Sequence, residues 1–211
     1  MVYAQFILFD GFDPLDVIAP YEVLTAGAAL AGVTADVRFV SAEGPRRVAG
    51  GVPGIALDAV APLDPELPGY VVVPGAAGPL DDIPVLLGRL GGTPLPGLVA
   101  KALADPGVTV ATVCGGSLAL AMAGLLDGRH VTTHHGGLGA LAATGAIAVD
   151  ARVVDDGDLI SGAGVTSGLD LGLHLVDRAF GSRVAHAVEQ LFQHERRGTV
   201  WRASGRTPVP A

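Results

Sequence analysis

The sequence predicts a doubly wound α/β fold, in which helices cover both faces of a mostly parallel sheet. Short apolar runs alternate with helical segments along the first two thirds of the chain. These runs are continuously apolar, as in strands that are buried on both faces. Two of them, at 70–73 and 108–113, lead directly into glycine-rich loops. Ligands of such sheets bind beyond the carboxyl ends of the strands, so we expect the function to reside in these loops.

The first strand and helix carry the clearest signals. Residues 2–9 form an apolar run that contains one glutamine, which predicts the first strand. Asp13 and Pro14 then open a helix, because an aspartate caps unpaired N–H groups and a proline suits the first turn. Asp16 follows within that turn, and the helix is predicted to end near Gly32.

The remaining elements follow in chain order. We predict strands at 37–40, 70–73, 108–113 and 130–132, short hairpins in the glycine-rich piece with 55–60 and through 156–157, and helices after Gly116, Thr166 and Ser182. We assign residues 1–196 to a single domain and 197–211 to a C-terminal tail, which is expected to be loose from residue 203 onward.

Composition limits the classes of function. The net charge of −8 opposes binding to a phosphate backbone, and the roughly 16 residues after Glu195 are too few for a DNA-binding domain, so we expect no nucleic-acid partner. No apolar run reaches the roughly 18 residues of a membrane span, and the N-terminus lacks the basic start of a signal peptide. The single cysteine leaves no intrachain disulfide. We therefore expect a cytoplasmic protein with a small-molecule substrate, no membrane partner and no cofactor.

Cys114 is the candidate nucleophile. It follows the strand 108–113 directly and precedes Gly115, Gly116 and Ser117. A nucleophile on a sharp strand-to-helix turn needs such small neighbours, and the N–H groups of a starting helix favour the thiolate. The alternative is a small buried apolar residue at a strand end, which is a common fate of a free cysteine. The glycines favour the nucleophile, because a core position does not require them.

Asp16 is the second candidate, and it also has a simpler interpretation. An acidic residue in the first turn of a helix complements the helix dipole without any further role. If the first strand is central, however, the turn after it lies beside the turn after the cysteine strand, and the Asp16 carboxyl can hydrogen-bond the sulfur of Cys114. Two acidic groups so close would share a proton, which would leave Asp16 protonated while Cys114 is a thiolate.

Further groups are expected beside these two. The loop after the strand 70–73 brings the N–H of Gly75 or Ala76 to an oxyanion, with the Gly115 N–H as partner, unless it is an ordinary tight turn. His134 and His135 are expected to line the same cleft. No acidic residue has the spacing of a metal motif to them, so we predict no metal site.

Four segments resemble, in order, segments of the DJ-1/PfpI superfamily: LFDGFDPLDVIAPYEVL, VVVPGAAG, TVCGGSLALAMAGLLDGRHVTTHH and RVVDDGDLISGAGVTSGLDLGLHLV. The resemblance extends from residue 2 to about residue 195 and is strongest to the branch with isonitrile hydratase and the amidase-like domains of some AraC-type regulators. It implies a flavodoxin-like fold, a homodimer and a cysteine nucleophile.

The resemblance also implies roles for particular residues. Cys114 and Asp16 match the cysteine and the aspartate of isonitrile hydratase, whereas Gly115 stands where that enzyme has a threonine. Ala76 replaces the second glycine of the family's loop, but the backbone N–H is retained. PfpI-type peptidases are less similar, because a histidine directly follows their cysteine.

Two classes of function follow from this resemblance. The first is an enzyme that hydrates a small isonitrile to an N-substituted formamide through a covalent intermediate on Cys114, with Asp16 as the proton donor. The second is a non-catalytic or redox sensor similar to DJ-1. Glyoxalase-like or amidase-like activity on another small molecule would use the same two residues, and the sequence does not separate these possibilities.

Overall fold

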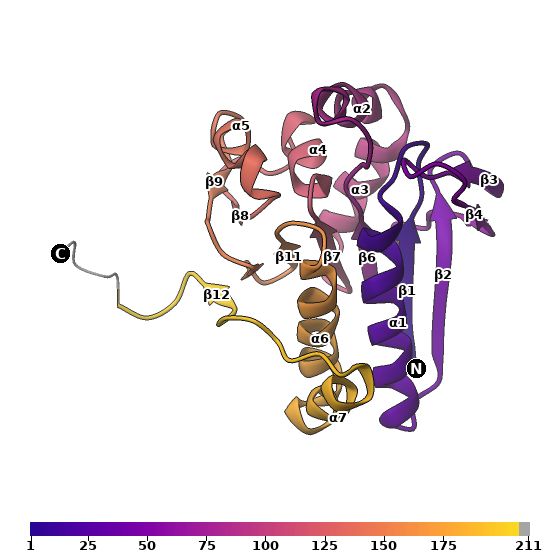
Figure 1. Cartoon of the computed structure of the whole chain (residues 1–211), viewed down its shortest axis with the longest axis vertical. Coiled ribbons are helices and arrows are strands. Elements are labelled where there is room, and N and C mark those ends of the chain that lie inside the picture. The colour runs from indigo at the N-terminus through magenta and orange to yellow at the C-terminus, as the bar shows by residue number, and fades with distance from the viewer. Residues whose placement is uncertain (207–211) are drawn as a thin grey trace.

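The computed structural model describes residues 1–206 of the chain. Its centre is an eight-stranded sheet of order β12-β10-β11-β7-β6-β1-β2-β5 (Figure 1), in which β10 and β11 are antiparallel and the other neighbours are parallel. The strands are β1 (Val2–Ile7), β2 (Ala35–Ser41), β5 (Ala61–Pro62), β6 (Gly69–Val73), β7 (Val108–Val113), β10 (Val153–Asp155), β11 (Leu159–Gly162) and β12 (Trp201–Arg202). The predicted parallel α/β sheet is confirmed.

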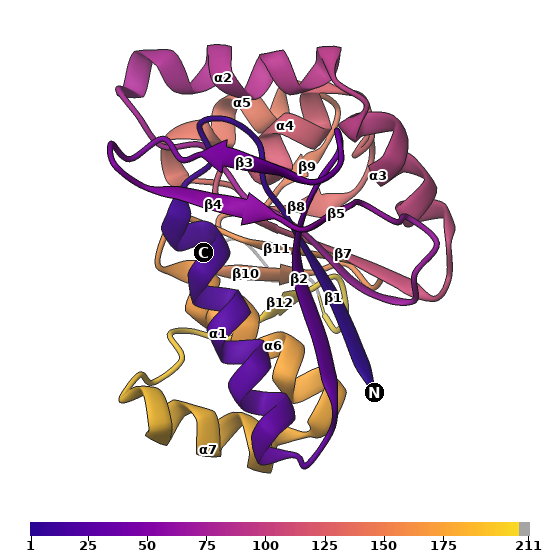
Figure 2. The ribbon, with the colours of Figure 1, turned by 90° about the vertical axis from the view of Figure 1, so that its right-hand side faces the viewer.

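Helices cover both faces of this sheet (Figure 2). On one side lie α1 (Pro14–Leu30), α6 (Ser167–Phe180) and α7 (Ser182–Phe192); on the other lie α2 (Ile83–Arg89), α3 (Leu95–Ala104), α4 (Gly116–Met122) and α5 (Leu138–Ala142). Single 3₁₀ turns form η1 (Leu80–Asp82), η2 (Leu90–Gly92) and η3 (His135–Gly137). Two small ladders pair β3 (Arg46–Ala49) with β4 (Ala56–Ala59), and β8 (His130–Val131) with β9 (Ile147–Ala148).

Helix α1 begins as its sequence predicts and packs closely against α6. The Asp13 side chain accepts the Leu15 N–H at 2.9 Å, which caps the helix. Glycines make the contact with α6 possible: a methyl group added to Gly172 would lie 2.9 Å from Val23 Cβ. This contact fixes the start of α1, and with it Asp16, relative to the sheet.

The helices between β6 and β7 were not predicted from the sequence. Residues 80–104 contain prolines and glycines that are typical of loops, yet they form η1, α2, η2 and α3. Pro84 and Pro96 each lie in the first turn of their helix, where a missing N–H costs nothing. Within the described residues, no single helix is long and apolar enough to cross a membrane, and the bent pair Leu80–Gly92 and Leu95–Ala104 reaches that length and hydropathy only when taken together.

The structure adds detail to two other predicted segments. In the hairpin expected from the glycine-rich piece with 55–60, the partner strand is Arg46–Ala49. The sequence did not indicate this strand, because its two arginines interrupt any apolar run. Residues 201–202 of the segment assigned to the tail form β12, in which Trp201 pairs with Val154 of β10. The ring centroid of Trp201 lies 5.0 Å from that of His130. The last five residues of the segment predicted to be loose, 207–211, lie outside the described part of the chain.

Asp155, at the end of β10, joins the tail to α6. Its carboxylate lies 2.9 Å from His174 Nε2 and also pairs with Arg178 and Arg202. Burial raises the pKa of Asp155, but the His174 hydrogen bond, the Gly157 N–H and Arg178 outweigh it and leave that pKa below 3.8. Burial lowers the pKa of His174 below 6.5.

Both shifts predict loss of stability in acid. The unfolded chain binds a proton at His174 as the pH falls below 6.5, whereas the folded protein resists it, so the free energy of unfolding falls. A further loss follows near and below pH 3.8, as Asp155 is protonated. We expect urea unfolding to show that His174→Gln makes the upper step smaller, leaving the part that comes from the lowered pKa of His134, while the exposed His186→Gln retains the whole step. Equal profiles for the two variants would contradict the assignment to His174.

Candidate functional site

Cys114 occupies a strained turn between β7 and α4. Its φ is 54°, a left-handed conformation that costs a non-glycine residue about 1 kcal/mol or more. The surrounding backbone holds it there: the Cys114 N–H lies 2.8 Å from the Ala163 carbonyl and 3.0 Å from the Gly162 carbonyl. The Cys114 carbonyl accepts the Thr133 hydroxyl at 2.7 Å. The predicted sharp turn is therefore present, and contacts from the end of β11 and from Thr133 hold the strained Cys114 in place.

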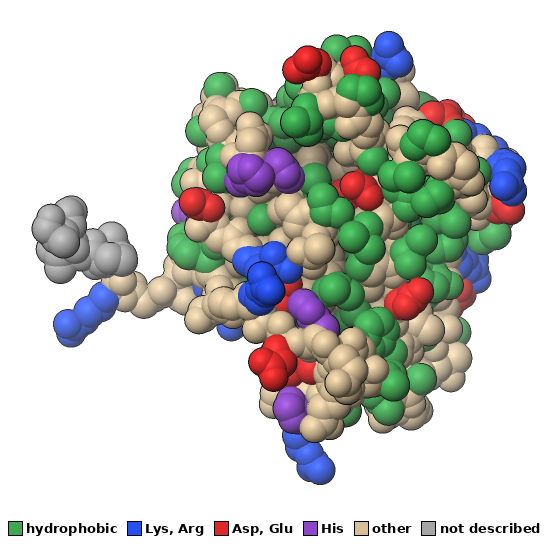
Figure 3. All heavy atoms as spheres, in the orientation of Figure 1, with side chains coloured by type: hydrophobic (Ala, Val, Ile, Leu, Met, Phe, Trp, Pro, Cys, Tyr) green, Lys and Arg blue, Asp and Glu red, His purple; other side chains and the backbone are tan. Residues whose placement is uncertain are grey.

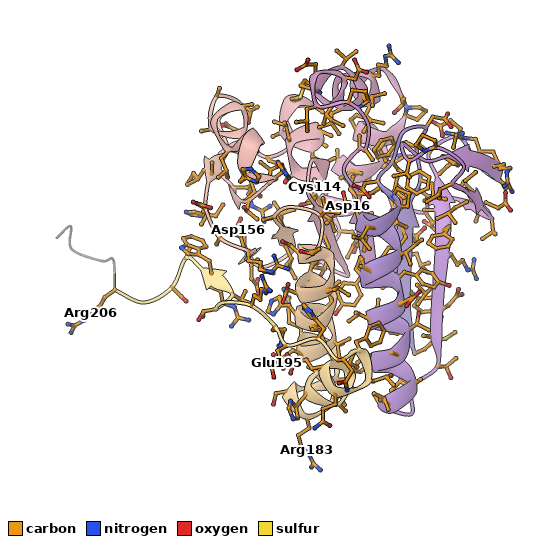
Figure 4. The ribbon with its side chains drawn as sticks, viewed as in Figure 1. Asp16, Cys114, Asp156, Arg183, Glu195 and Arg206 are labelled. Carbon is orange, nitrogen blue, oxygen red and sulfur yellow. The ribbon has the colours of Figure 1, made fainter. Side chains whose placement is uncertain are left out.

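The loop after β6 connects Asp16 to this turn. Figure 4 labels Cys114 and Asp16 next to each other at the upper end of α1. The turn after β1 and the turn after β7 were predicted to be direct neighbours. They are not, because β6 lies between β1 and β7. Gly75, which follows β6, fills the gap, and its N–H donates to Asp16 Oδ2 at 2.9 Å. A methyl group added to Gly75 would lie 2.5 Å from Gly115 N and 3.1 Å from Cys114 Cβ.

Burial dominates the electrostatics of the pair. The Asp16 side chain is fully buried, which raises its pKa well above 3.8; the negative charge of Asp13 adds to this, and the Gly75 N–H and the Cys114 side chain only partly oppose it. Burial, followed by the charge of Asp16, raises the pKa of Cys114 to about 12. The N–H groups of Gly115 and Val165 act in the opposite direction but are outweighed.

The expectation that the start of α4 makes Cys114 a thiolate is therefore wrong for the protein without substrate. Two backbone N–H groups do not compensate for removing the sulfur from water beside a carboxylate. The related expectation for Asp16 is supported, because its carboxyl resists ionisation. Its second oxygen, Oδ1, is buried and has no hydrogen-bond partner within residues 1–206. At neutral pH the thiol keeps its proton beside a carboxyl group that also favours its neutral form.

The predicted oxyanion groups are only partly available. The Gly75 N–H is occupied by Asp16, so this residue positions the carboxyl instead. The Ala76 N–H has no hydrogen-bond partner in the described chain, while Gly115 N–H faces the sulfur of Cys114. Val165, whose N–H also reaches that sulfur, was missed. The glycine-rich segment 162–164, at the end of β11, could have indicated that Val165 lies near the site, since β11 ends at the same edge of the sheet as β7.

The two predicted histidines directly follow Thr133, whose hydroxyl donates to the Cys114 carbonyl. Their ring centroids are 4.2 Å apart, and His134 accepts the Gly136 N–H through Nδ1. Burial and the neighbouring His135 lower the pKa of His134. His135 lines a cavity of about 380 Å³ together with Thr133, Asp150, Ala151, Arg152, Ala163, Gly164 and Ser167. Across residues 1–206, no cluster of three or more histidine, cysteine or acidic side chains has the geometry to hold a metal ion.

The sequence and fold match those of known proteins. The model of the DJ-1/PfpI family matches residues 3–178. The chain belongs to the DJ-1/PfpI family. A ThiJ/PfpI family protein from Pseudomonas syringae has a similar solved structure, with a TM-score of 0.78 and 25% identity over 93% of this chain and 76% of that one. The resemblance inferred from the four sequence segments is thereby confirmed.

Curated relatives of this DJ-1/PfpI chain have different functions. Isonitrile hydratase of Pseudomonas putida is 45% identical over 80 residues, which are 38% of this chain and 35% of the enzyme. The HTH-type transcriptional regulator GbdR of Pseudomonas aeruginosa is 36% identical over 98 residues, 46% of this chain and 27% of the regulator. The matches thus span well under half of either relative. Family membership is compatible with an enzyme and with part of a regulator.

Gly75 provides a test of this geometry that does not depend on function. Gly75→Ala places a methyl group 2.5 Å from Gly115 N, and such overpacking typically costs about 1–3 kcal/mol of unfolding free energy. Gly97→Ala is the matched control, because Gly97 lies in α3 with no atom within 4 Å of an added methyl group. We expect urea unfolding to show a loss for the first variant and none for the second. Equal stabilities would show that Gly75 does not lie as close to Gly115 and Cys114 as these distances state.

Proposed function

We propose that this protein is an enzyme that hydrates a small isonitrile to an N-substituted formamide, with Cys114 as the nucleophile and Asp16 as the acid and base. The observation that carries the proposal is that these two buried side chains contact each other and that burial raises the pKa of both. A buried carboxyl group with a raised pKa can deliver a proton at neutral pH, and its Oδ1 has no other hydrogen-bond partner in the described chain.

The first step forms a covalent intermediate. The terminal carbon of R–N≡C takes the proton of the Asp16 carboxyl, and the sulfur of Cys114 bonds to the same carbon. The thiol proton passes to the Asp16 carboxylate as the sulfur attacks, so a free thiolate is not required beforehand. The product is the thioimidate R–N=CH–S–Cys114, which contains every atom of the isonitrile and of the thiol.

The second step releases the product. Water adds to the thioimidate carbon while Asp16 relays one of its protons to the nitrogen, which gives R–NH–CH(OH)–S–Cys114. The carbon–sulfur bond then breaks, the hydroxyl proton returns to the sulfur through Asp16, and R–NH–CHO leaves. The sum is one isonitrile and one water converted to one formamide, with no oxidation or reduction.

We propose that backbone N–H groups assist this second step. Negative charge develops on the added oxygen as its proton leaves, before the carbon–sulfur bond breaks, and fixed N–H donors stabilise such charge. We assign this role to the N–H groups of Ala76 and Gly115, with Val165 holding the sulfur. Gly115 offers no hydroxyl, so the substrate oxygen meets backbone donors at that position.

The choice of substrate rests on the 45% identity with isonitrile hydratase, and a direct assay tests it. Purified protein is incubated with isonitriles, 2-oxoaldehydes and amides, and the products are separated by chromatography. We expect N-substituted formamide from the isonitriles, and none with Cys114→Ala. Formation of a 2-hydroxy acid from the oxoaldehydes, with no formamide, would replace this proposal with a glyoxalase-like one.

A ligand-sensing role is the second candidate, and the match to GbdR favours it. The same Cys114 and Asp16 would then bind a small molecule without turnover. Saturable binding of an isonitrile that leaves it chemically unchanged would support this role. Because a relative is a transcriptional regulator, the predicted absence of a nucleic-acid partner is not a property of the whole family.

We also propose that the protein is a homodimer, as the resemblance implies, and acts in the cytoplasm. Sedimentation at micromolar concentration should then give about 42 kDa, twice the mass of the 21.1 kDa chain. A species that stays at the mass of one chain would contradict the dimer and leave the chemistry of Cys114 unaffected.

A further inference from the structure

Helix α2 lies above the turn that carries Cys114 (Figures 1 and 4). Of the residues of α2, all in the described part of the chain, Leu87 alone is buried, with 1% of its surface exposed. Val85 of the same helix is 55% exposed, and Leu80 just before it is 82% exposed. Apolar side chains therefore cover part of the outer surface in this region (Figure 3). Leu87 is the one α2 side chain fully enclosed by the protein.

Leu87 occupies the space that a side chain at residue 115 would need. A methyl group added to Gly115 would lie 2.8 Å from Leu87 Cδ1 and 3.4 Å from Cδ2. The first distance is shorter than any ordinary carbon–carbon contact, which is optimal at about 3.5–4.0 Å. The leucine therefore packs directly against the residue that follows Cys114.

We propose that Leu87 determines which substrates reach Cys114, by restricting the thiol to electrophiles with a narrow reactive end. Cys114 is only 7% exposed, so any substrate must pass between the surrounding side chains. An isonitrile presents a single carbon at the end of a linear group, whereas an amide or ketone carbonyl is planar and carries two substituents on the carbon attacked. A leucine side chain against Gly115 admits the first shape more readily than the second. The name of the substrate rests on the proposed function; the access control rests on the geometry alone.

Labelling of the single cysteine tests the access control without any assay of turnover. Methyl methanethiosulfonate presents a narrow sulfur to the thiol, and N-ethylmaleimide presents a broad ring. The ratio of their rate constants is measured for the intact protein and for Leu87→Ala, at one pH and under folded conditions. A change in the pKa of Cys114 alters both rates together, so it cancels from the ratio.

We expect Leu87→Ala to shift this ratio toward N-ethylmaleimide by about tenfold, the effect of a modest change in barrier. Leu87→Val, which removes less of the side chain, should shift it by a smaller factor and serves if the alanine variant does not fold. The control is Val85→Ala, on the exposed side of the same helix, which should leave the ratio unchanged. An unchanged ratio in folded Leu87→Ala or Leu87→Val, or an equal shift in Val85→Ala, would overturn the proposal.

A double substitution tests the shared space directly. Gly115→Thr should lower the melting temperature when Leu87 is present, and should lower it less when combined with Leu87→Ala. Additive effects of the two changes would overturn the assignment of a common space. If the labelling ratio shifts as expected but no isonitrile is hydrated, the access control stands and the proposed function fails. If isonitriles are hydrated and the ratio does not shift, the reverse holds.

Discussion

Replacing Cys114 with alanine is expected to abolish formamide production while leaving the protein folded. In the proposed mechanism Cys114 and Asp16 act as one unit, and removing the nucleophile of such a unit lowers the rate on the order of a millionfold. The side chain packs in a buried turn, so alanine should change the free energy of unfolding only modestly. Product formation by chromatography and urea unfolding measure the two quantities. Turnover within tenfold of the unaltered protein would remove Cys114 from the mechanism.

Glycine at the same position separates strain from chemistry. The φ of 54° is costly for cysteine and for alanine, but glycine adopts it freely. Cys114→Gly should therefore be more stable than Cys114→Ala, by about 1 kcal/mol, and equally inactive. Such a result would indicate that the protein retains a strained residue at this turn for the sake of its thiol. A glycine variant no more stable than the alanine one would show that the turn is not strained.

The sequence alone indicated Cys114 and Asp16 as candidates for clear physical reasons. Buried parallel strands appear as uninterrupted apolar runs, and the abrupt change from such a run to Cys114-Gly115-Gly116 can be read without a structure. Asp16 was identifiable because Asp13 and Pro14 fix where α1 begins. Both signals are local, and local patterns are what a sequence displays directly.

The rest of the site depends on contacts between distant segments. Leu87 lies in a segment whose prolines and glycines indicate a loop, and its position against Gly115 follows only from how α2 packs. The Gly75 N–H was assigned to an oxyanion because nothing in the sequence shows that β6 separates β1 from β7. The pKa of Cys114 was predicted in the wrong direction, since burial is set by the whole fold and outweighs the two nearby N–H groups.

Asp16→Asn should nearly abolish turnover and, at the same time, make the thiol easier to ionise. Asparagine retains an oxygen for the Gly75 N–H but has no proton to deliver, and loss of a general acid costs about a hundredfold to ten-thousandfold in rate. The charge of Asp16 is the second-largest cause of the raised pKa of Cys114, after burial. Removing it should bring that pKa below about 12, so iodoacetamide labelling should begin at lower pH. A more readily ionised thiol with less activity would exclude thiolate formation as the limiting factor.

The stability of the same variant has a predicted sign. A carboxyl group whose pKa is raised on folding contributes stability that is present at low pH and lost as the pH rises through the folded pKa. Asp16→Asn removes this loss, so at neutral pH the variant should unfold no more easily than the unaltered protein. Asp13→Asn is the matched control: it also lies at the start of α1, asparagine caps nearly as well, and turnover should change little. If Asp16 serves only the helix, both variants will keep their turnover, even though the loss of the Asp16 charge still lowers the pKa of Cys114. The proton transfers assigned to Asp16 would then have no donor.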